Sequence, residues 1–139
     1  MAIYVNKDIQ VKVNTVDLTT YVTSVEVVNA VDSVEVTSMS ASAVNGHIFT
    51  GGLQNNTVTI NFNQDFAATK VHATLKGLVG VPTTVVVRPT SAVAAAGTNP
   101  DFTVTSALMS EYRPVMGAVG DLATVGAITF SGGLYTETA

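Results

Sequence analysis

Hydrophobic and polar residues alternate along much of the chain, and this alternation predicts β-strands. The clearest strand covers residues 54–63. Its apolar positions are Val58, Ile60 and Phe62, and its polar positions are Thr57, Thr59, Asn61 and Asn63. Because successive side chains of a strand point to opposite faces, one face is expected in the core and an uncharged polar face outside.

Further segments show the same two-residue period. We expect strands near residues 3–5, 11–13, 23–28, 34–37, 84–88, 102–112 and 128–134, with the first two forming an N-terminal hairpin. One face of the strand at residues 102–112 is marked by Phe102, Val104, Leu108 and Tyr112, and the last strand is defined by Ile128, Phe130 and Leu134.

One segment has a helical period instead. Its apolar stripe consists of Ala67, Val71, Leu75 and Leu78. Asp65 is suited to accept hydrogen bonds from the first turn as an N-cap, and Gly80 and Pro82 would end the helix. We therefore predict a helix that begins near Asp65 and ends before Gly80.

The fold class follows from these elements. About eight strands are joined by turns and accompanied by one helix, which favours a mainly β (α+β) protein: an antiparallel two-sheet sandwich or barrel with a flanking helix. Composition agrees, because Val, Thr and Ile make up 49 of the 139 residues and Leu only seven. The length favours a single domain over residues 1–139.

Residues 38–52 interrupt the strand pattern with small, flexible residues and are expected to form a long loop. Loops of this length in compact domains are usually functional or disordered. Ile48 and Phe49 give this one an apolar tip, which indicates a dry contact with a partner. Met39 and His47 belong to the same candidate contact segment.

The low content of charged residues narrows the classes of function that the protein can have. Only 12% of residues are charged, the net charge is −4, and there are six Lys and Arg residues, which argues against a surface that binds phosphates. The low charge indicates that partners or copies of the chain cover much of the surface.

The sequence does not predict a membrane span, because it contains no apolar run of 18 residues. The first residues do not have the pattern of a secretory signal.

The chemistry of an enzyme is not evident in the sequence. There is no Cys, no Gly-x-Ser-x-Gly turn and no phosphate-binding glycine motif. His72 has no acidic residue four positions away on its helical face, and His47 lies in the flexible loop, so we expect both to be structural or exposed. Glu26 and Glu35 are candidates for a carboxylate pair across a hairpin, but like charges opposed on a sheet are destabilising, so we expect each to be an ordinary solvated strand residue. We expect no catalytic site, no metal and no cofactor.

Several segments, taken in order, resemble the tail tube proteins of long-tailed bacteriophages of actinobacteria. Residues 17–25 (DLTTYVTSV) and 34–37 (VEVT) are similar to that family's opening, and Gly-Leu at 52–53 with residues 62–66 (FNQDF) to a later stretch. The similarity continues at residues 86–89 (VVRP), 99–102 (NPDF), 112–117 (YRPVMG) and 119–123 (VGDLA). It runs from about Asp17 to Gly132.

This resemblance implies a structural subunit of a virion tail, made in the host cytoplasm, that forms hexameric rings stacked into a tube. DNA would pass through the channel without specific binding, and tape-measure and tail-terminator proteins would be partners. The polar positions Thr57, Thr59, Asn61 and Asn63 are candidates for the channel wall, or for the tube exterior. Alternatives are a capsid decoration or cement protein and a carbohydrate-binding sandwich; aromatic residues are too scarce to favour the latter.

Overall fold

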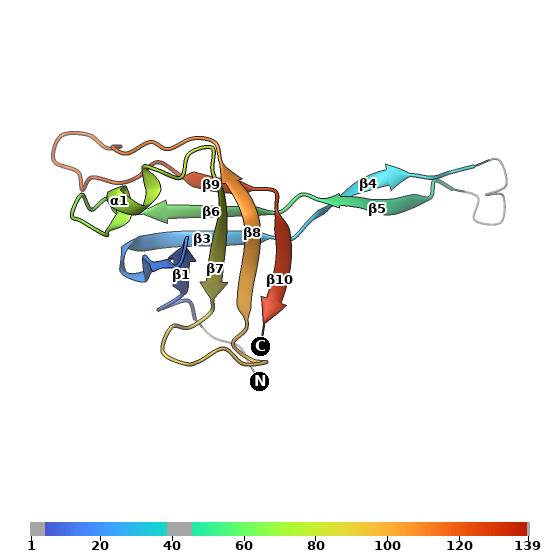
Figure 1. The fold of residues 1–139 in the computed structure, drawn as a ribbon, viewed down its shortest axis with the longest axis horizontal. Helices are drawn as coiled ribbons and strands as arrows, with labels where there is room; N and C mark the ends of the chain where they lie inside the picture. The colour runs from blue at the N-terminus through green and yellow to red at the C-terminus, as the bar shows by residue number, and fades with distance from the viewer. Residues whose placement is uncertain (1–4, 39–45, 139) are drawn as a thin grey trace.

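The computed structural model describes residues 5–38 and 46–138 and confirms the predicted fold class: antiparallel β-sheets with one short α-helix. Figure 1 shows the arrangement. The strands are β1 (Gln10–Val13), β2 (Val16–Asp17), β3 (Val22–Val28), β4 (Val31–Glu35), β5 (Phe49–Gln54), β6 (Thr57–Phe62), β7 (Pro82–Arg88), β8 (Asp101–Met109), β9 (Ile128–Ser131) and β10 (Leu134–Thr138). The helices are the 3-10 turn η1 (Thr19–Tyr21) and α1 (Val71–Leu75).

Eight strands form one continuous sheet. We call this sheet, together with α1 and the connecting loops, the body. Its order is β2-β1-β7-β8-β9-β6-β3, and β10 also pairs with β8. One edge of β8 pairs with β7, and the other pairs first with β10 and then with β9. The sheet bends at β8, so that β7, β8 and β10 lie across β3, β6 and β9 as two layers (Figure 1).

The hydrophobic core lies inside this bent sheet. It takes Val11 and Val13 from β1 and Val58, Ile60 and Phe62 from β6, each at most 1% exposed. The alternation predicted for residues 54–63 is confirmed over β6. Burial of these apolar surfaces is the main stabilising contribution to the body.

A second sheet lies outside the body. Strands β4 and β5 pair with each other in an antiparallel hairpin, which we call the arm, and it projects away from the body (Figure 1). Every strand residue of the arm is exposed. The loop predicted over residues 38–52 is therefore wrong for residues 49–52, which belong to β5. Met39, in the same predicted segment, lies outside the described residues.

The predicted helix is also shorter in the structure. Helix α1 has five residues, because Thr69 has a positive φ of 64° and Lys70 is extended. Asp65 forms a tight turn instead of capping the helix: its Oδ1 accepts a hydrogen bond from Ala67 N at 2.9 Å. Val71 and Leu75 are buried as predicted, whereas Ala67 is exposed.

Two predicted strands depart from simple alternation. Ser106 has a φ of 57°, and two residues of β8, Thr105 and Ser106, oppose the single residue Thr84 of β7, which is a β-bulge. The bulge moves Ala107 and Met109 into the core and leaves Leu108 40% exposed. The last predicted strand divides into β9 and β10 at two glycines, and Leu134 is exposed.

The predicted N-terminal hairpin is not formed as expected. Residues 1–4 lie outside the described part, and Val5 belongs to no strand. β1 pairs with β2 and β7 instead.

Candidate assembly surfaces

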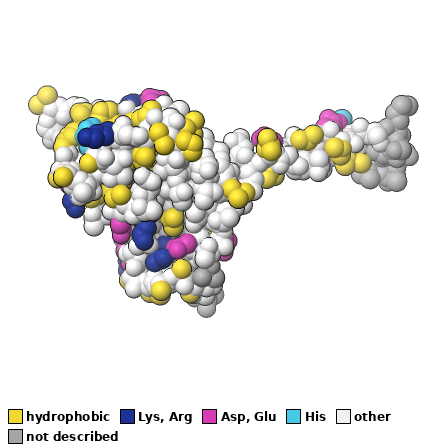
Figure 2. Space-filling model, in the orientation of Figure 1, with side chains coloured by type: hydrophobic (Ala, Val, Ile, Leu, Met, Phe, Trp, Pro, Cys, Tyr) yellow, Lys and Arg dark blue, Asp and Glu magenta, His cyan; other side chains and the backbone are white. Residues whose placement is uncertain are grey.

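The arm exposes apolar side chains along its length. The exposed fractions are 55% for Val31, 46% for Val34, 50% for Val36, 58% for Phe49 and 81% for Leu53. Figure 2 shows hydrophobic side chains along the projecting part of the molecule. An isolated two-stranded hairpin is marginally stable in water, and contiguous exposed apolar side chains mark interaction sites. The arm is therefore a candidate docking element.

The far end of the arm gathers the predicted contact residues His47, Ile48 and Phe49. His47 Nδ1 lies 2.6 Å from Glu35 Oε1, and its ring centroid lies 6.4 Å from that of Phe49. Ile48 N donates to Thr37 Oγ1 at 2.7 Å. Three of the four predicted residues thus meet there, with His47 paired to a carboxylate that sequence spacing did not indicate.

The base of the arm is fixed by Asn56, which is fully buried. Its Oδ1 accepts from Ala30 N at 3.2 Å, and its Nδ2 donates to Gln54 Oε1 at 3.0 Å and to Gly133 O at 3.1 Å. Gln54 Oε1 also accepts from Tyr135 N at 3.0 Å. These bonds join both strands of the arm to the start of β10, and the sequence pattern did not reveal them.

The polar positions of β6 belong to a wider polar face. Across the sheet, Thr59 pairs with Glu26 of β3 and with Thr129 of β9. Asn61 Nδ2 donates to Ser24 Oγ at 2.6 Å. Thr57 pairs with Ser131, and Asn63 follows the strand in a bridge to Thr124. The outer face over β3, β6 and β9 is mostly hydroxyl and amide, with Glu26 as its carboxylate.

Glu26 and Glu35 do not oppose each other. Glu26 lies opposite Thr59 in the body, and Glu35 lies opposite Phe49 in the arm. The candidate carboxylate pair does not form, because β3 and β4 pair with different partners, and each residue is exposed on its own strand as expected.

The other layer has a charged outer face. Lys12 of β1 pairs across the sheet with Asp17, and Arg88 of β7 contacts Asp101 of β8. Arg88 Nε and Nη2 donate to Asp101 Oδ1 and Oδ2 at 2.6 and 3.0 Å. These hydrogen bonds, with the positive charge of Arg88, lower the pKa of Asp101. The two outer faces therefore differ in charge although both are built from alternating strands.

His72 has a structural environment. Its Nδ1 lies 2.9 Å from Tyr112 Oη, and its ring centroid lies 5.1 Å from that of Phe66. Gln64 Nε2 donates to the same hydroxyl at 3.0 Å. These contacts attach the chain that follows β8 to α1.

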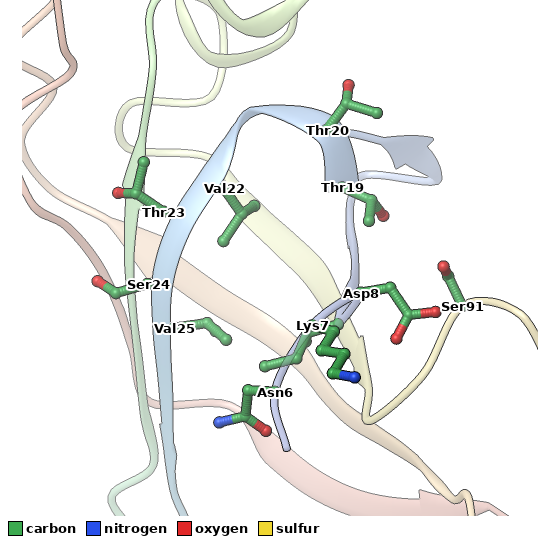
Figure 3. Close-up of a pocket in the computed structure, with 11 residues that line it drawn as sticks. Asn6, Lys7, Asp8, Thr19, Thr20, Val22, Thr23, Ser24, Val25 and Ser91 are labelled. Carbon is green, nitrogen blue, oxygen red and sulfur yellow. The ribbon is translucent and has the colours of Figure 1, made fainter. Parts of the chain in front are cut away.

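A groove of about 600 Å³ runs along β3, which ends the strand order of the sheet. Figure 3 shows Asn6, Lys7 and Asp8 on one side and Thr23, Ser24 and Val25 on the other. The residues that line it are mainly polar and contain no His. The groove lies along the edge of β3 that is not paired with another described strand, with residues 6–9 on its opposite side.

Within the described residues, no group of three or more His, Asp or Glu side chains is placed to bind a metal ion. In the same part of the chain, no helix has the length and hydrophobicity needed to cross a membrane.

No protein-family model matches the chain, and the search of curated proteins finds no match. Solved structures do match. The chain is similar to the sheath/tube terminator of an extracellular contractile injection system, PVC, in the extended state, with 13% identity and a TM-score of 0.66 over 94% of this chain and 93% of that one. It is also similar to a chain of the tail of an empty GTA particle, solved with C6 symmetry, with 15% identity and a TM-score of 0.53 over 86% and 83%. The chain has a tail-tube-like fold.

Proposed function

We propose that the protein is a structural subunit of a phage-tail-like tube and assembles with copies of itself into stacked hexameric rings. The observation that carries this proposal is the arm, whose strand residues are all exposed and include Val31, Phe49 and Leu53. The arm contributes little to the stability of a monomer, because its side chains stay in water, whereas an assembly buries them. The tail-tube-like fold and the C6 symmetry of one similar structure support the ring.

Ring formation has a physical route through the sheet edges. Among the described strands, β3 pairs with β6 alone and β10 with β8 alone, so each offers one free edge. Edge pairing between neighbouring copies satisfies these backbone groups and removes an aggregation hazard. In our proposal the sheets of six copies join in this way around a channel.

We further propose that the polar face around Thr57, Thr59 and Asn61 lines the channel, with Asn63 at its border. A wall of hydroxyls and amides has no positive charge to neutralise phosphates, so we expect DNA to pass without specific binding. A ring of six chains with net charge −4 each carries −24, which also opposes DNA adhesion. Tape-measure and terminator proteins are the expected further partners, and the virion tail is the expected location.

The position of the polar face is testable with Thr59→Cys, because the chain has no native Cys. Thr103→Cys on the outer face of the other layer is the matched control. We expect a maleimide on a bulky polymer to label both variants when dissociated, but only the control in assembled tubes. Equal labelling of both in tubes places Thr59 outside the channel.

A second candidate function is a terminator that closes the end of a tube. The similarity to the sheath/tube terminator favours it, since that match has the larger of the two TM-scores, 0.66 against 0.53. The two functions predict different growth of the assembly. A tube subunit adds rings as the protein concentration rises, whereas a terminator stops at one ring. Sedimentation velocity over a range of concentrations separates them.

The arm's role is tested by Leu53→Ser, with Val93→Ser as the control. Both side chains are exposed, at 81% and 56%, but Val93 lies in the loop between β7 and β8. Burying one such side chain contributes about 1.5–3 kcal/mol, so we expect Leu53→Ser to raise the concentration needed for assembly about tenfold or more. The control should assemble like the native protein. Unchanged assembly of Leu53→Ser would show that the arm is not the joint.

A further inference from the structure

The free edge of β10 is not open along its whole length. Among the described strands β10 pairs only with β8, and Tyr135 lies opposite Val104. Tyr135 N donates to the side chain of Gln54, at 3.0 Å from its Oε1. The N–H groups of successive strand residues point to opposite edges, so the N–H of Tyr135 points away from β8. A side chain from another part of the chain therefore occupies the first outward position of this edge.

The second outward position of β10 belongs to Glu137. Its backbone has the orientation of Tyr135, because it lies two residues further along the strand. The side chain of Glu137 is exposed, and charged side chains on an edge strand oppose pairing with another chain. Of the two outward positions, one is thus bonded to an amide and the other carries a charge.

The amide that covers Tyr135 comes from the base of the arm. Gln54 is the last residue of β5, and its Oε1 also accepts from Asn56 Nδ2 at 3.0 Å. Asn56 is fully buried and donates to Gly133 O as well, just before β10 begins. In Figure 1 the start of β10 lies beside the point where the arm leaves the body. The amide of Gln54 is therefore held in place by the hydrogen bonds that fix the base of the arm.

The contact between Gln54 and Tyr135 is exchangeable. Gln54 is exposed, and the hydrogen bond to Tyr135 N is exposed with it. A strand that pairs with β10 brings a backbone carbonyl to Tyr135 N, and the released amide of Gln54 is solvated by water. Pairing thus replaces one hydrogen bond with another, and the side chain of Gln54 competes with the incoming strand for the same N–H.

We propose that Gln54 is an edge cap, which covers β10 in the free subunit and is displaced when a neighbouring copy pairs with this edge. The inference rests on the proposed self-assembly and adds a control on it. The cap stabilises the free subunit against edge pairing, and each new joint releases an amide at the base of the arm. It also opposes irregular aggregation, because an added strand has to bind in the register that replaces the Gln54 hydrogen bond.

Two variants change the strength of the cap in opposite directions. Gln54→Ala removes the acceptor of Tyr135 N, whereas Gln54→Glu replaces it with a carboxylate, which accepts hydrogen bonds more strongly. Asn55→Ala and Asn55→Asp are the matched controls at the next residue, which is also exposed. We expect Gln54→Ala to lower the concentration needed for assembly about three- to tenfold relative to Asn55→Ala. Gln54→Glu should raise it relative to Asn55→Asp, which adds the same charge.

Hydrogen exchange in the monomer measures the contact itself. Below the concentration needed for assembly, we expect the Tyr135 amide to exchange about three- to tenfold faster in Gln54→Ala than in Asn55→Ala, because it has lost its acceptor. The Thr136 amide, which points towards β8, should exchange at the same rate in both variants. Sedimentation velocity of the same proteins over a range of concentrations gives their assembly.

The two measurements separate the edge cap from the proposed function. An unchanged exchange rate at Tyr135 in Gln54→Ala overturns the cap, and so does faster exchange without assembly at a lower concentration. Either result leaves the proposed function intact. If the native chain and Gln54→Ala both stay monomeric at every concentration, the proposed function is wrong and the cap with it. Faster exchange together with assembly at a lower concentration supports both.

Discussion

The arm and the body use similar strand sequences for opposite purposes. Residues 34–37 (VEVT) of the arm and strand β6 both alternate apolar and polar residues, yet Ile60 is fully buried in the body whereas Val34 of the arm is 46% exposed. The body therefore encloses its apolar side chains within one chain, and the arm presents them outward. The comparison teaches that alternation identifies a strand but does not say which molecule buries its apolar face.

The comparison is tested most strongly by truncating one Phe in each region. Phe62 is 1% exposed and Phe49 is 58% exposed. We expect Phe62→Ala to lower the free energy of unfolding by about 3–5 kcal/mol, because it leaves a cavity in the core. Phe49→Ala should change it by less than about 0.5 kcal/mol in the monomer. Urea denaturation measures both; similar losses would mean that the arm packs on its own body.

The next largest loss of stability is expected when either of two adjacent glycines between β9 and β10 is substituted. Gly132 and Gly133 have φ values of 78° and 79°, so Ala strains both backbones. A Cβ on Gly133 would lie 2.1 Å from Thr105 O, whereas one on Gly132 meets nothing within 4 Å. We expect Gly133→Ala to be about 2–3 kcal/mol less stable than Gly132→Ala. Equal thermal stability of the two variants would contradict this geometry.

Asn56→Ala tests the joint between the two regions. The substitution leaves Ala30 N and Gly133 O without their side-chain partner, which costs about 1–3 kcal/mol. We expect faster hydrogen exchange at the Ala30 amide and a lower free energy of unfolding. Asn61→Ala, which loses a bond to Ser24 on the outer face, is the control and should change stability less. If the Ala30 amide exchanges at the native rate, Asn56 does not hold the base of the arm.

The sequence predicted the regular part of the fold. Strand β6, the short helical segment at Val71 and Leu75 and the antiparallel class follow from local periodicity, which one strand or helix determines by itself. The bulge at Ser106 was not predictable in this way, because a positive φ in a non-glycine residue is imposed by the register between β7 and β8. In the arm, residues 34–37 were predicted as a strand, whereas residues 49–52 of β5 were predicted as loop, because Gly51 and Gly52 are poor strand formers and their pairing depends on the partner β4.

The candidate surfaces were predictable in part. The apolar pair Ile48 and Phe49 stood out in a segment of small residues and indicated a contact. The hydrogen bonds of Asn56 did not stand out, because they depend on a residue distant in sequence, Gly133.

The central claim is that copies of this chain assemble through surfaces that a monomer leaves exposed. Negative-stain electron microscopy of the purified protein over a range of concentrations tests it most directly. We expect rings at low concentration and stacked rings or tubes at higher concentration, with six-fold symmetry in end views. A uniform 14.3 kDa monomer at every concentration, without rings or tubes, would contradict the account.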